Sequence, residues 1–169
     1  MKNQKDTKSY KPVPSYVIAN YFIDKSLEDW VYVDILKLIK LVYISHGWRL
    51  ALENIPLIKD KIEAWKYGPS IPYMYRLFLK SKNKSDERII YKIEPLFNFI
   101  KYQIQTDLLD DVWRVYGDFS SIQLANICND ENSAYNVIKR EVDLNKIYIG
   151  PEIHNDIIRK HYMELLKRG

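Results

Sequence analysis

Residues 34–54 read DILKLIKLVYISHGWRLALEN and form the most informative stretch of the chain. Asp34 is a residue type that caps helix N-termini, and Asn54 is one that adopts the left-handed conformation that ends helices. The polar positions between them do not form one stripe, because Lys37 and Lys40 lie on one side and His46, Arg49 and Glu53 on nearly the opposite side. A helix that is apolar all round in its middle is buried by neighbours on several sides. We therefore predict that this segment is the central helix of the fold.

Several shorter amphipathic segments surround this stretch, each with its own start or stop signals. We expect a helix capped by Ser15 before the central segment. Later helices are expected to start at Ser70 with Pro72 in the first turn, to run from Thr106 to Gly117, and to start at Ser120 or Ser121, at Ser133, and after Gly150-Pro151. Short strands are expected around 62–65 and 89–93, with a charged loop at 80–88. The predicted fold class is mainly α, a compact bundle of about six or seven helices around a buried central helix, with one or two short strands.

The length and composition indicate one globular domain. The chain has 169 residues, of which 47% are hydrophobic and 28% charged, so it can bury a sizeable core and is not intrinsically disordered. Residues 1–14 are polar, contain Pro12 and Pro14, and are predicted to form a flexible N-terminal arm before a single domain at 15–169. The net charge of +4 is scattered along the chain, which argues against a dedicated nucleic-acid binder.

The compartment is predicted from what the chain lacks. Cys128 is the single cysteine, so no internal disulfide can form, and this suits a reducing environment. The lysine-rich start has no apolar segment of the kind found in signal peptides, and no apolar run approaches the roughly 20 residues that span a bilayer. We expect a cytoplasmic protein without a membrane contact.

The sequence does not predict a catalytic or metal-binding site from the residues that could form one. Cys128 lies in an apolar-patterned helix and is interpreted as a buried small residue, and His46 as a hydrogen-bonded structural histidine. His154 and His161 are seven residues apart, too far along a helix for one zinc ion. No phosphate-binding or zinc motif occurs. We expect no catalytic residues, no metal and no cofactor, and so no enzyme.

One aromatic cluster is the candidate functional site. It combines Trp65, Lys66, Tyr67, Tyr73 and Tyr75 with two prolines around Gly68. Two interpretations are open. Trp65 and Tyr67 could pin a turn onto the core, as large aromatic residues commonly do. Alternatively, the cluster is a rigid surface that contacts a partner, because binding hot spots favour Trp, Tyr and Arg. These five residues are the predicted partner contacts.

The same stretch carries a resemblance to a known family. The blocks that carry it are Ala19-Asn20-Tyr21-Phe22, Leu36 to Tyr43 continuing to His46-Gly47-Trp48, Ile62 to Pro69 with Pro72 and Tyr75, and Asp111-Val112-Trp113 with Tyr116-Gly117 and Leu124. In this combination the chain resembles the Panacea domain family of SocA-like antitoxins, also described as phage-associated proteins, over about 15–162. It departs from the family at Ile39, often glutamine, and at Asn54, often glycine. Cys128-Asn129 and Ala134-Tyr135 stand where the family commonly has Thr-His and Pro-Trp, so this chain lacks that histidine.

The resemblance implies a mainly α-helical antitoxin that neutralises a cognate toxin protein of a toxin–antitoxin system by direct contact. A cellular protease or chaperone is a further candidate partner, and the oligomeric state stays open. The alternative function is a nucleic-acid-binding regulator of a mobile-element or phage operon, for which the sequence pI of 8.9 and the basic arm are the motive.

Overall fold

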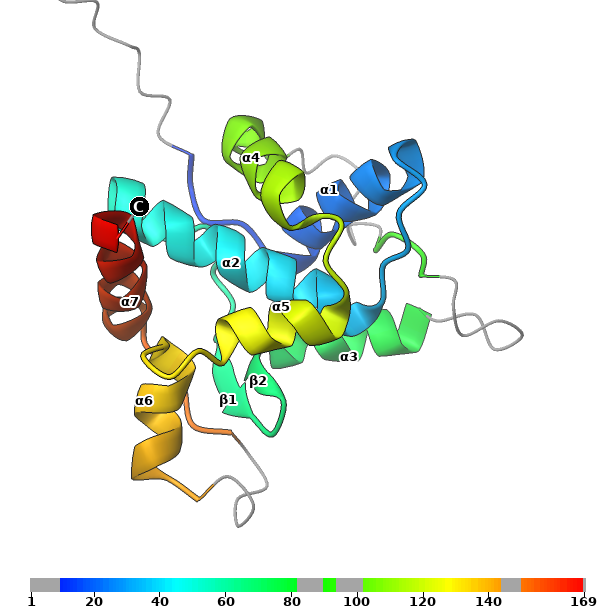
Figure 1. The fold of residues 1–169 in the computed structure, drawn as a ribbon. Helices are drawn as coiled ribbons and strands as arrows, with labels where there is room; N and C mark the ends of the chain where they lie inside the picture. The colour runs from blue at the N-terminus through cyan, green and yellow to red at the C-terminus, as the bar shows by residue number, and fades with distance from the viewer. Residues whose placement is uncertain (1–9, 82–89, 94–101, 144–149, 169) are drawn as a thin grey trace, which may run out of the picture.

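The central helix α2, Ile35–Glu53, passes through the middle of the molecule, as the sequence predicts (Figure 1). The Asp34 carboxylate accepts a hydrogen bond from the Lys37 backbone N–H at 2.7 Å, and Asn54 ends the helix with a φ of 57°. Neighbours contact α2 from several directions, namely α1, α3, α4, α5, α7 and β2. Most of its side chains are buried, including those of Lys37, Lys40 and Arg49.

The computed structural model describes residues 10–81, 90–93, 102–143 and 150–168. Within these ranges the chain forms seven helices and one two-stranded antiparallel sheet, which confirms the predicted mainly α class. Besides α2, the elements are α1 (Ser15–Glu28), β1 (Glu63–Trp65), β2 (Gly68–Ser70), α3 (Pro72–Ser81), α4 (Thr106–Tyr116), α5 (Ser121–Cys128), α6 (Ala134–Glu141) and α7 (Asn155–Arg168). None of these helices is long and apolar enough to cross a membrane, in the part of the chain that the structure describes.

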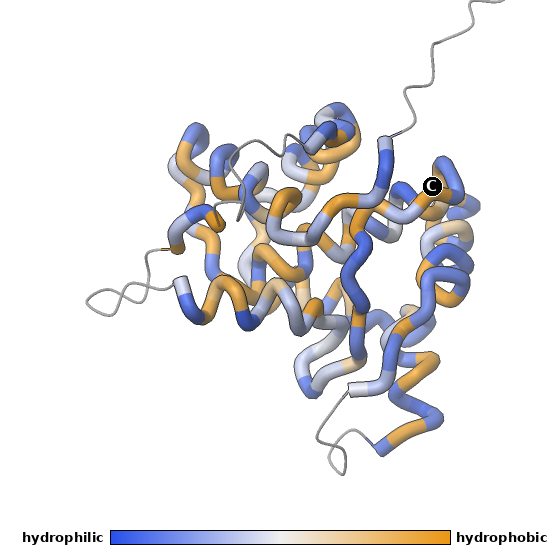
Figure 2. The backbone as a smooth tube through the Cα atoms, turned by 180° about the vertical axis from the view of Figure 1, so that it is seen from behind, coloured by the Kyte–Doolittle hydropathy of each residue, from blue (hydrophilic) through white to orange (hydrophobic). Residues whose placement is uncertain are grey.

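The outer helices are amphipathic, and local caps start some of them where the sequence predicts. Figure 2 shows hydrophilic and hydrophobic residues alternating along the outer helices. Ser120 begins α5 with a capping box in which its side chain and that of Gln123 are reciprocal partners. The Ser133 side chain accepts from the Asn136 N–H at the start of α6. These signals are local in the sequence, and so they could be predicted without the fold.

Two of the predicted caps are wrong. Ser15 is the first residue of α1 and makes no side-chain cap; its backbone N–H instead donates to the Asp60 carboxylate at 2.5 Å. Ser70 lies in β2 rather than at a helix start, and α3 begins at Pro72. At Ser15 a carboxylate far along the chain satisfies a backbone N–H at the helix start, whereas Ser70 is paired with Glu63 in the hairpin.

The described part of the N-terminal segment is paired with a later loop. The Val13 N–H donates to the Leu57 carbonyl at 3.1 Å, and the Lys59 N–H donates to the Val13 carbonyl at 3.0 Å. Arg49 donates to the Tyr10 carbonyl at 2.5 Å. Residues 1–9 lie outside the described ranges.

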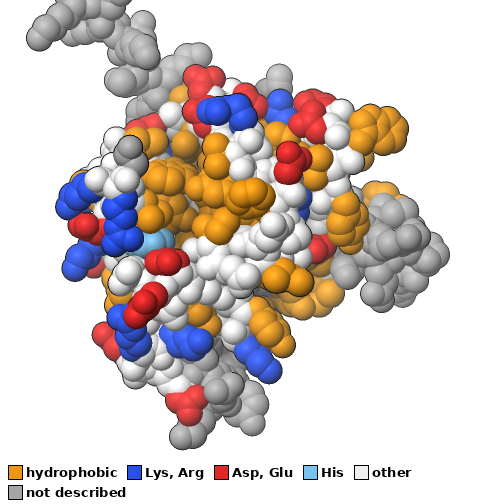
Figure 3. Space-filling view, in the orientation of Figure 1, with side chains coloured by type: hydrophobic (Ala, Val, Ile, Leu, Met, Phe, Trp, Pro, Cys, Tyr) orange, Lys and Arg blue, Asp and Glu red, His pale blue; other side chains and the backbone are white. Residues whose placement is uncertain are grey.

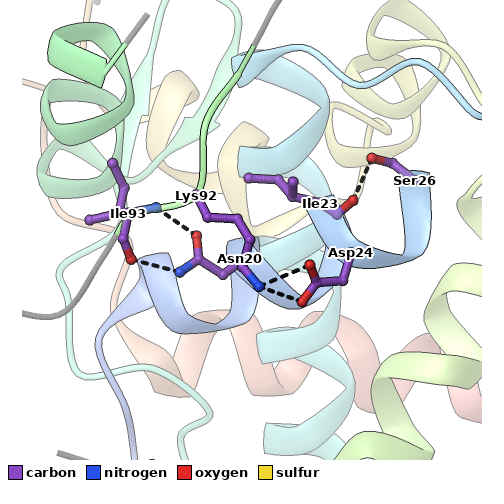
Figure 4. Close-up of polar contacts among 6 residues, drawn as sticks. All are labelled: Asn20, Ile23, Asp24, Ser26, Lys92 and Ile93. Carbon is purple, nitrogen blue, oxygen red and sulfur yellow. Dashed lines mark hydrogen bonds and ion pairs between the residues drawn. The ribbon is translucent and has the colours of Figure 1, made fainter. Parts of the chain in front are cut away.

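The described residues of the predicted strand at 89–93 form no strand and are tied to α1 instead (Figure 4). The Asn20 side chain pairs with the backbone of Ile93, donating to its carbonyl at 2.7 Å and accepting from its N–H at 2.9 Å. Lys92 forms an ion pair with Asp24 at 2.7 Å. An amide side chain therefore supplies the hydrogen bonds that a neighbouring strand would have supplied. Residue 89 and most of the expected charged loop at 80–88 lie outside the described residues.

Candidate functional site: the hairpin surface

The β1–β2 hairpin places the aromatic cluster on the outside of the central helix. Trp65 pairs with Gly68 in the antiparallel register, so Lys66 and Tyr67 form a tight two-residue turn. The other edge of β1 is held by residues 151–153, since the Ala64 N–H donates to the Pro151 carbonyl at 2.8 Å. The turn is thus fixed on a scaffold that joins distant parts of the chain.

An apolar pocket of about 290 Å³ opens beside this turn. Its lining comes from the first turns of α2, from the hairpin and from α3: Leu36, Ile39, Lys40, Trp65, Lys66, Tyr67, Gly68, Pro69, Ser70 and Tyr75. We call this set the hairpin surface. The rings of Trp65 and Tyr75 pack edge to face, with centroids 5.4 Å apart, whereas Tyr67 is 67% exposed. The lining is mainly apolar, and of its two lysines Lys66 is exposed whereas Lys40 is buried, so the pocket suits an apolar side chain.

Lys40 connects the central helix to the hairpin turn. Its ammonium donates to the carbonyls of Tyr67 at 3.0 Å and Pro69 at 2.8 Å, and its side chain is almost completely buried. Burial lowers the pKa of Lys40 to about 8, because the charged form loses its hydration. The carbonyls compensate part of that loss. The position of Tyr67 therefore depends on a buried lysine 27 residues earlier in the chain.

Lys37 makes an equivalent connection one turn earlier on α2. Its ammonium donates to the Gly117 carbonyl at 2.5 Å and to the Tyr32 carbonyl at 3.3 Å. Burial lowers the pKa of Lys37 as well. The two lysines that the sequence places on one side of the helix are thus buried, and each holds the backbone of an exposed tyrosine.

The two segments that Lys40 joins are those that carry the family resemblance. The family model described as antitoxin SocA-like, Panacea domain, matches residues 38–135, more than half of the chain. The chain belongs to this family. It is also 27% identical over 162 residues to a protein named Antitoxin SocA from Caulobacter vibrioides (strain NA1000 / CB15N), covering 92% of this chain and 86% of that protein. No solved structure matches the chain.

In this Panacea-domain chain, four of the five predicted contact residues line one pocket and Tyr73 does not. Trp65, Lys66, Tyr67 and Tyr75 belong to the hairpin surface. Tyr73 is 41% exposed and is not among the residues that line the pocket. Residues two apart on a helix do not face the same side, which separates Tyr73 from Tyr75. Leu36, Ile39 and Lys40 are site residues that the cluster itself did not include; the family block on α2 contained them.

Asn129 packs beneath the turn. A Cβ added to Gly68, whose φ is 102°, would lie 2.3 Å from the Asn129 Oδ1 and 2.7 Å from the Lys40 Nζ. Gly68 therefore brings the turn into close contact with both groups. Asn129 thus contributes to the support of the hairpin surface.

The remaining candidate residues are structural in the described part of the chain. Cys128 is buried, and burial raises the pKa of its thiol to about 12, which disfavours a reactive thiolate. The His46 Nε2 pairs with the Asn155 Oδ1 at 2.8 Å, and its Nδ1 accepts from the backbone N–H groups of Leu57 and Ile58. This confirms the interpretation of His46 as a hydrogen-bonded core residue. Among described residues, no three His, Cys, Asp or Glu side chains are placed to hold a metal ion.

Proposed function

We propose that this chain is an antitoxin that binds a cognate toxin protein through the hairpin surface and holds it inactive without catalysis. Family membership and the 27% identical Antitoxin SocA support the antitoxin role. The burial of Cys128 and the fully engaged His46 support a binding protein over an enzyme, because neither group is available as a nucleophile or a base.

The observation that carries the direct-contact mechanism is the preformed pocket beside an exposed tyrosine. Tyr67 is 67% exposed, yet its backbone carbonyl is fixed by Lys40, so the backbone of the turn loses little conformational freedom on binding. The pocket of about 290 Å³ beside it provides a place for an apolar side chain of the toxin. Such pairs of an aromatic anchor and a pocket dominate the binding energy of many interfaces.

The experiment begins with capture of the protein that binds this chain in its native cytosol, followed by a growth assay in which the captured protein is expressed alone and then together with the chain. Expressed alone, that protein is expected to arrest growth, and the unmodified chain is expected to restore it. Tyr67→Ala and Leu36→Arg should lose protection, because the first removes the exposed anchor and the second places a long cationic side chain in the pocket. Affinity for the purified protein should fall about tenfold or more in each variant.

Tyr73→Ala is the matched control, because Tyr73 is also a half-exposed tyrosine but lies outside the hairpin surface. If Tyr73→Ala retains protection, the toxin contact is confined to the pocket side of α3. If Tyr73→Ala loses protection, the contact extends around that helix. Full protection by both Tyr67→Ala and Leu36→Arg would overturn the role of the hairpin surface. A chain that leaves growth arrest unchanged and binds DNA with strongly salt-dependent affinity would overturn the antitoxin proposal itself.

A further inference from the structure

A second exposed aromatic surface lies where α1 ends and α2 begins. Leu27, Trp30 and Tyr32 are 69%, 95% and 60% exposed, so almost no part of the Trp30 side chain is covered. Figure 3 shows hydrophobic side chains on the right of this face, near the end of α1 and the start of α2. We call these three residues the Trp30 surface. Exposed apolar groups of this size, gathered at one place, mark interaction sites.

The backbone beneath the Trp30 surface is held firmly. The Val31 N–H donates to the Ser26 carbonyl at 2.9 Å, and the Trp113 indole N–H donates to the Asp29 carboxylate at 2.6 Å. Lys37 holds the Tyr32 carbonyl from the core side. Val31 and Val33 pack inward, so the side chains alternate between the core and solvent. The exposed rings are therefore displayed by a fixed loop.

Trp30 occupies a position at which glycine is favoured. Its φ is 57°, and the hydrogen bond from Val31 to Ser26 is the one that closes a helix through a left-handed residue. A bulky side chain is rarely found there, because its Cβ crowds the backbone. Trp30 thus carries backbone strain and leaves a large ring in water, and neither stabilises the folded chain. Strain of this kind concentrates at functional sites.

The charges around the Trp30 surface are mainly acidic. Glu28 and Asp29 border it on the chain, Asp34 caps the start of α2, and Asp118 directly follows Gly117, whose carbonyl accepts from the Lys37 ammonium. The described cations here are already engaged: Lys25 with Glu28 and Asp110, and Lys37 in the core. An apolar surface with this border complements a polypeptide segment that carries apolar side chains next to lysine or arginine.

We propose that the Trp30 surface binds a cationic, apolar segment of the same toxin that the hairpin surface contacts. This inference rests on the proposed function. Lys37 and Lys40, one turn apart on α2, fix the Tyr32 loop and the Tyr67 turn to the same helix end. A toxin that spans this end of α2 meets an apolar pocket on one side and an acidic aromatic surface on the other.

The test uses the captured growth-arresting protein as the probe in a binding titration, together with thermal melting of each variant. Trp30→Gly is expected to weaken binding about tenfold or more while the melting temperature stays the same or rises, because glycine relieves the strain. A purely structural Trp30 would give the opposite pattern, a lower melting temperature with unchanged affinity. Leu166→Ala, a change at another exposed apolar residue on α7, is expected to alter neither.

Charge variants test the chemistry of the partner segment. Asp118→Lys should weaken binding and reduce its salt dependence, whereas Glu131→Lys, an equal charge change in the loop after α5, should leave both unchanged. If binding is tight and neither Trp30→Gly nor Asp118→Lys weakens it, the proposed role of the Trp30 surface is overturned and the proposed function stays intact. Absence of binding by the unmodified chain would instead overturn the proposed function.

Discussion

Acidification should destabilise this protein through His46, and the structure gives the size of the effect. The imidazole is 1% exposed, its Nδ1 accepts from two backbone N–H groups at 3.3 Å, and its Nε2 donates to Asn155. A second proton on Nδ1 would remove that acceptor and bury a charge. Burial is the largest cause that lowers the pKa of His46, from 6.5 to about 4.

The sign follows from linkage between proton binding and folding. Between the two pKa values the unfolded chain binds a proton that the folded chain does not, so the free energy of unfolding falls as the pH falls. The full shift corresponds to about 3 kcal/mol, and a drop from about pH 7.5 to about pH 5 corresponds to about 2 kcal/mol. The stabilising contribution is complete above the unfolded pKa and is lost as the pH falls toward about 4.

Urea unfolding monitored by circular dichroism at several pH values in this range measures the effect directly. The unmodified chain should lose about 2 kcal/mol near pH 5 through His46, whereas His46→Gln should be less stable at neutral pH and should lose much less stability on acidification. Burial also lowers the pKa of His161, so His161→Gln is the control variant. Its free energy of unfolding should retain most of the pH dependence of the unmodified chain. A pH dependence equal in His46→Gln and the unmodified chain would refute the assignment to this residue.

Three further predictions concern the hairpin and the core. Gly68→Ala should lower the free energy of unfolding by about 2 kcal/mol or more in urea titrations, because φ is 102° and the new Cβ would meet Asn129 and Lys40. The control Ala125→Gly, at a half-buried helical position, should lower the free energy of unfolding by only about 1 kcal/mol. Lys40→Met should speed amide exchange in residues 63–70 about tenfold, because the Tyr67 and Pro69 carbonyls lose their donor, and exchange unchanged from the parent would refute the connection. Cys128 should resist a thiol reagent at about pH 8 until the chain unfolds, because it is buried with a raised thiol pKa; immediate labelling of the folded chain would contradict this.

The central helix and several caps could be predicted from the sequence because their signals are local. The apolar pattern of residues 34–54 and the caps at Asp34, Ser120 and Ser133 involve groups within four residues of one another. The single buried cysteine and the structural histidine followed from residue type and surroundings. The candidate site was predicted in part: Trp65, Lys66, Tyr67 and Tyr75 meet at one pocket.

Only the tertiary structure decided how those residues are supported and which of them share a surface. Ser15 is the first residue of α1 and not its cap, and its backbone N–H is bound by Asp60, far along the chain. The Asn20 amide replaced an expected strand partner at residues 90–93. The sequence marked Lys37 and Lys40 as polar positions, yet their burial depends on carbonyls that only folding brings to them. Local patterns determine which elements form, whereas the partners of a buried charge are set by contacts between distant segments, and no local pattern encodes those.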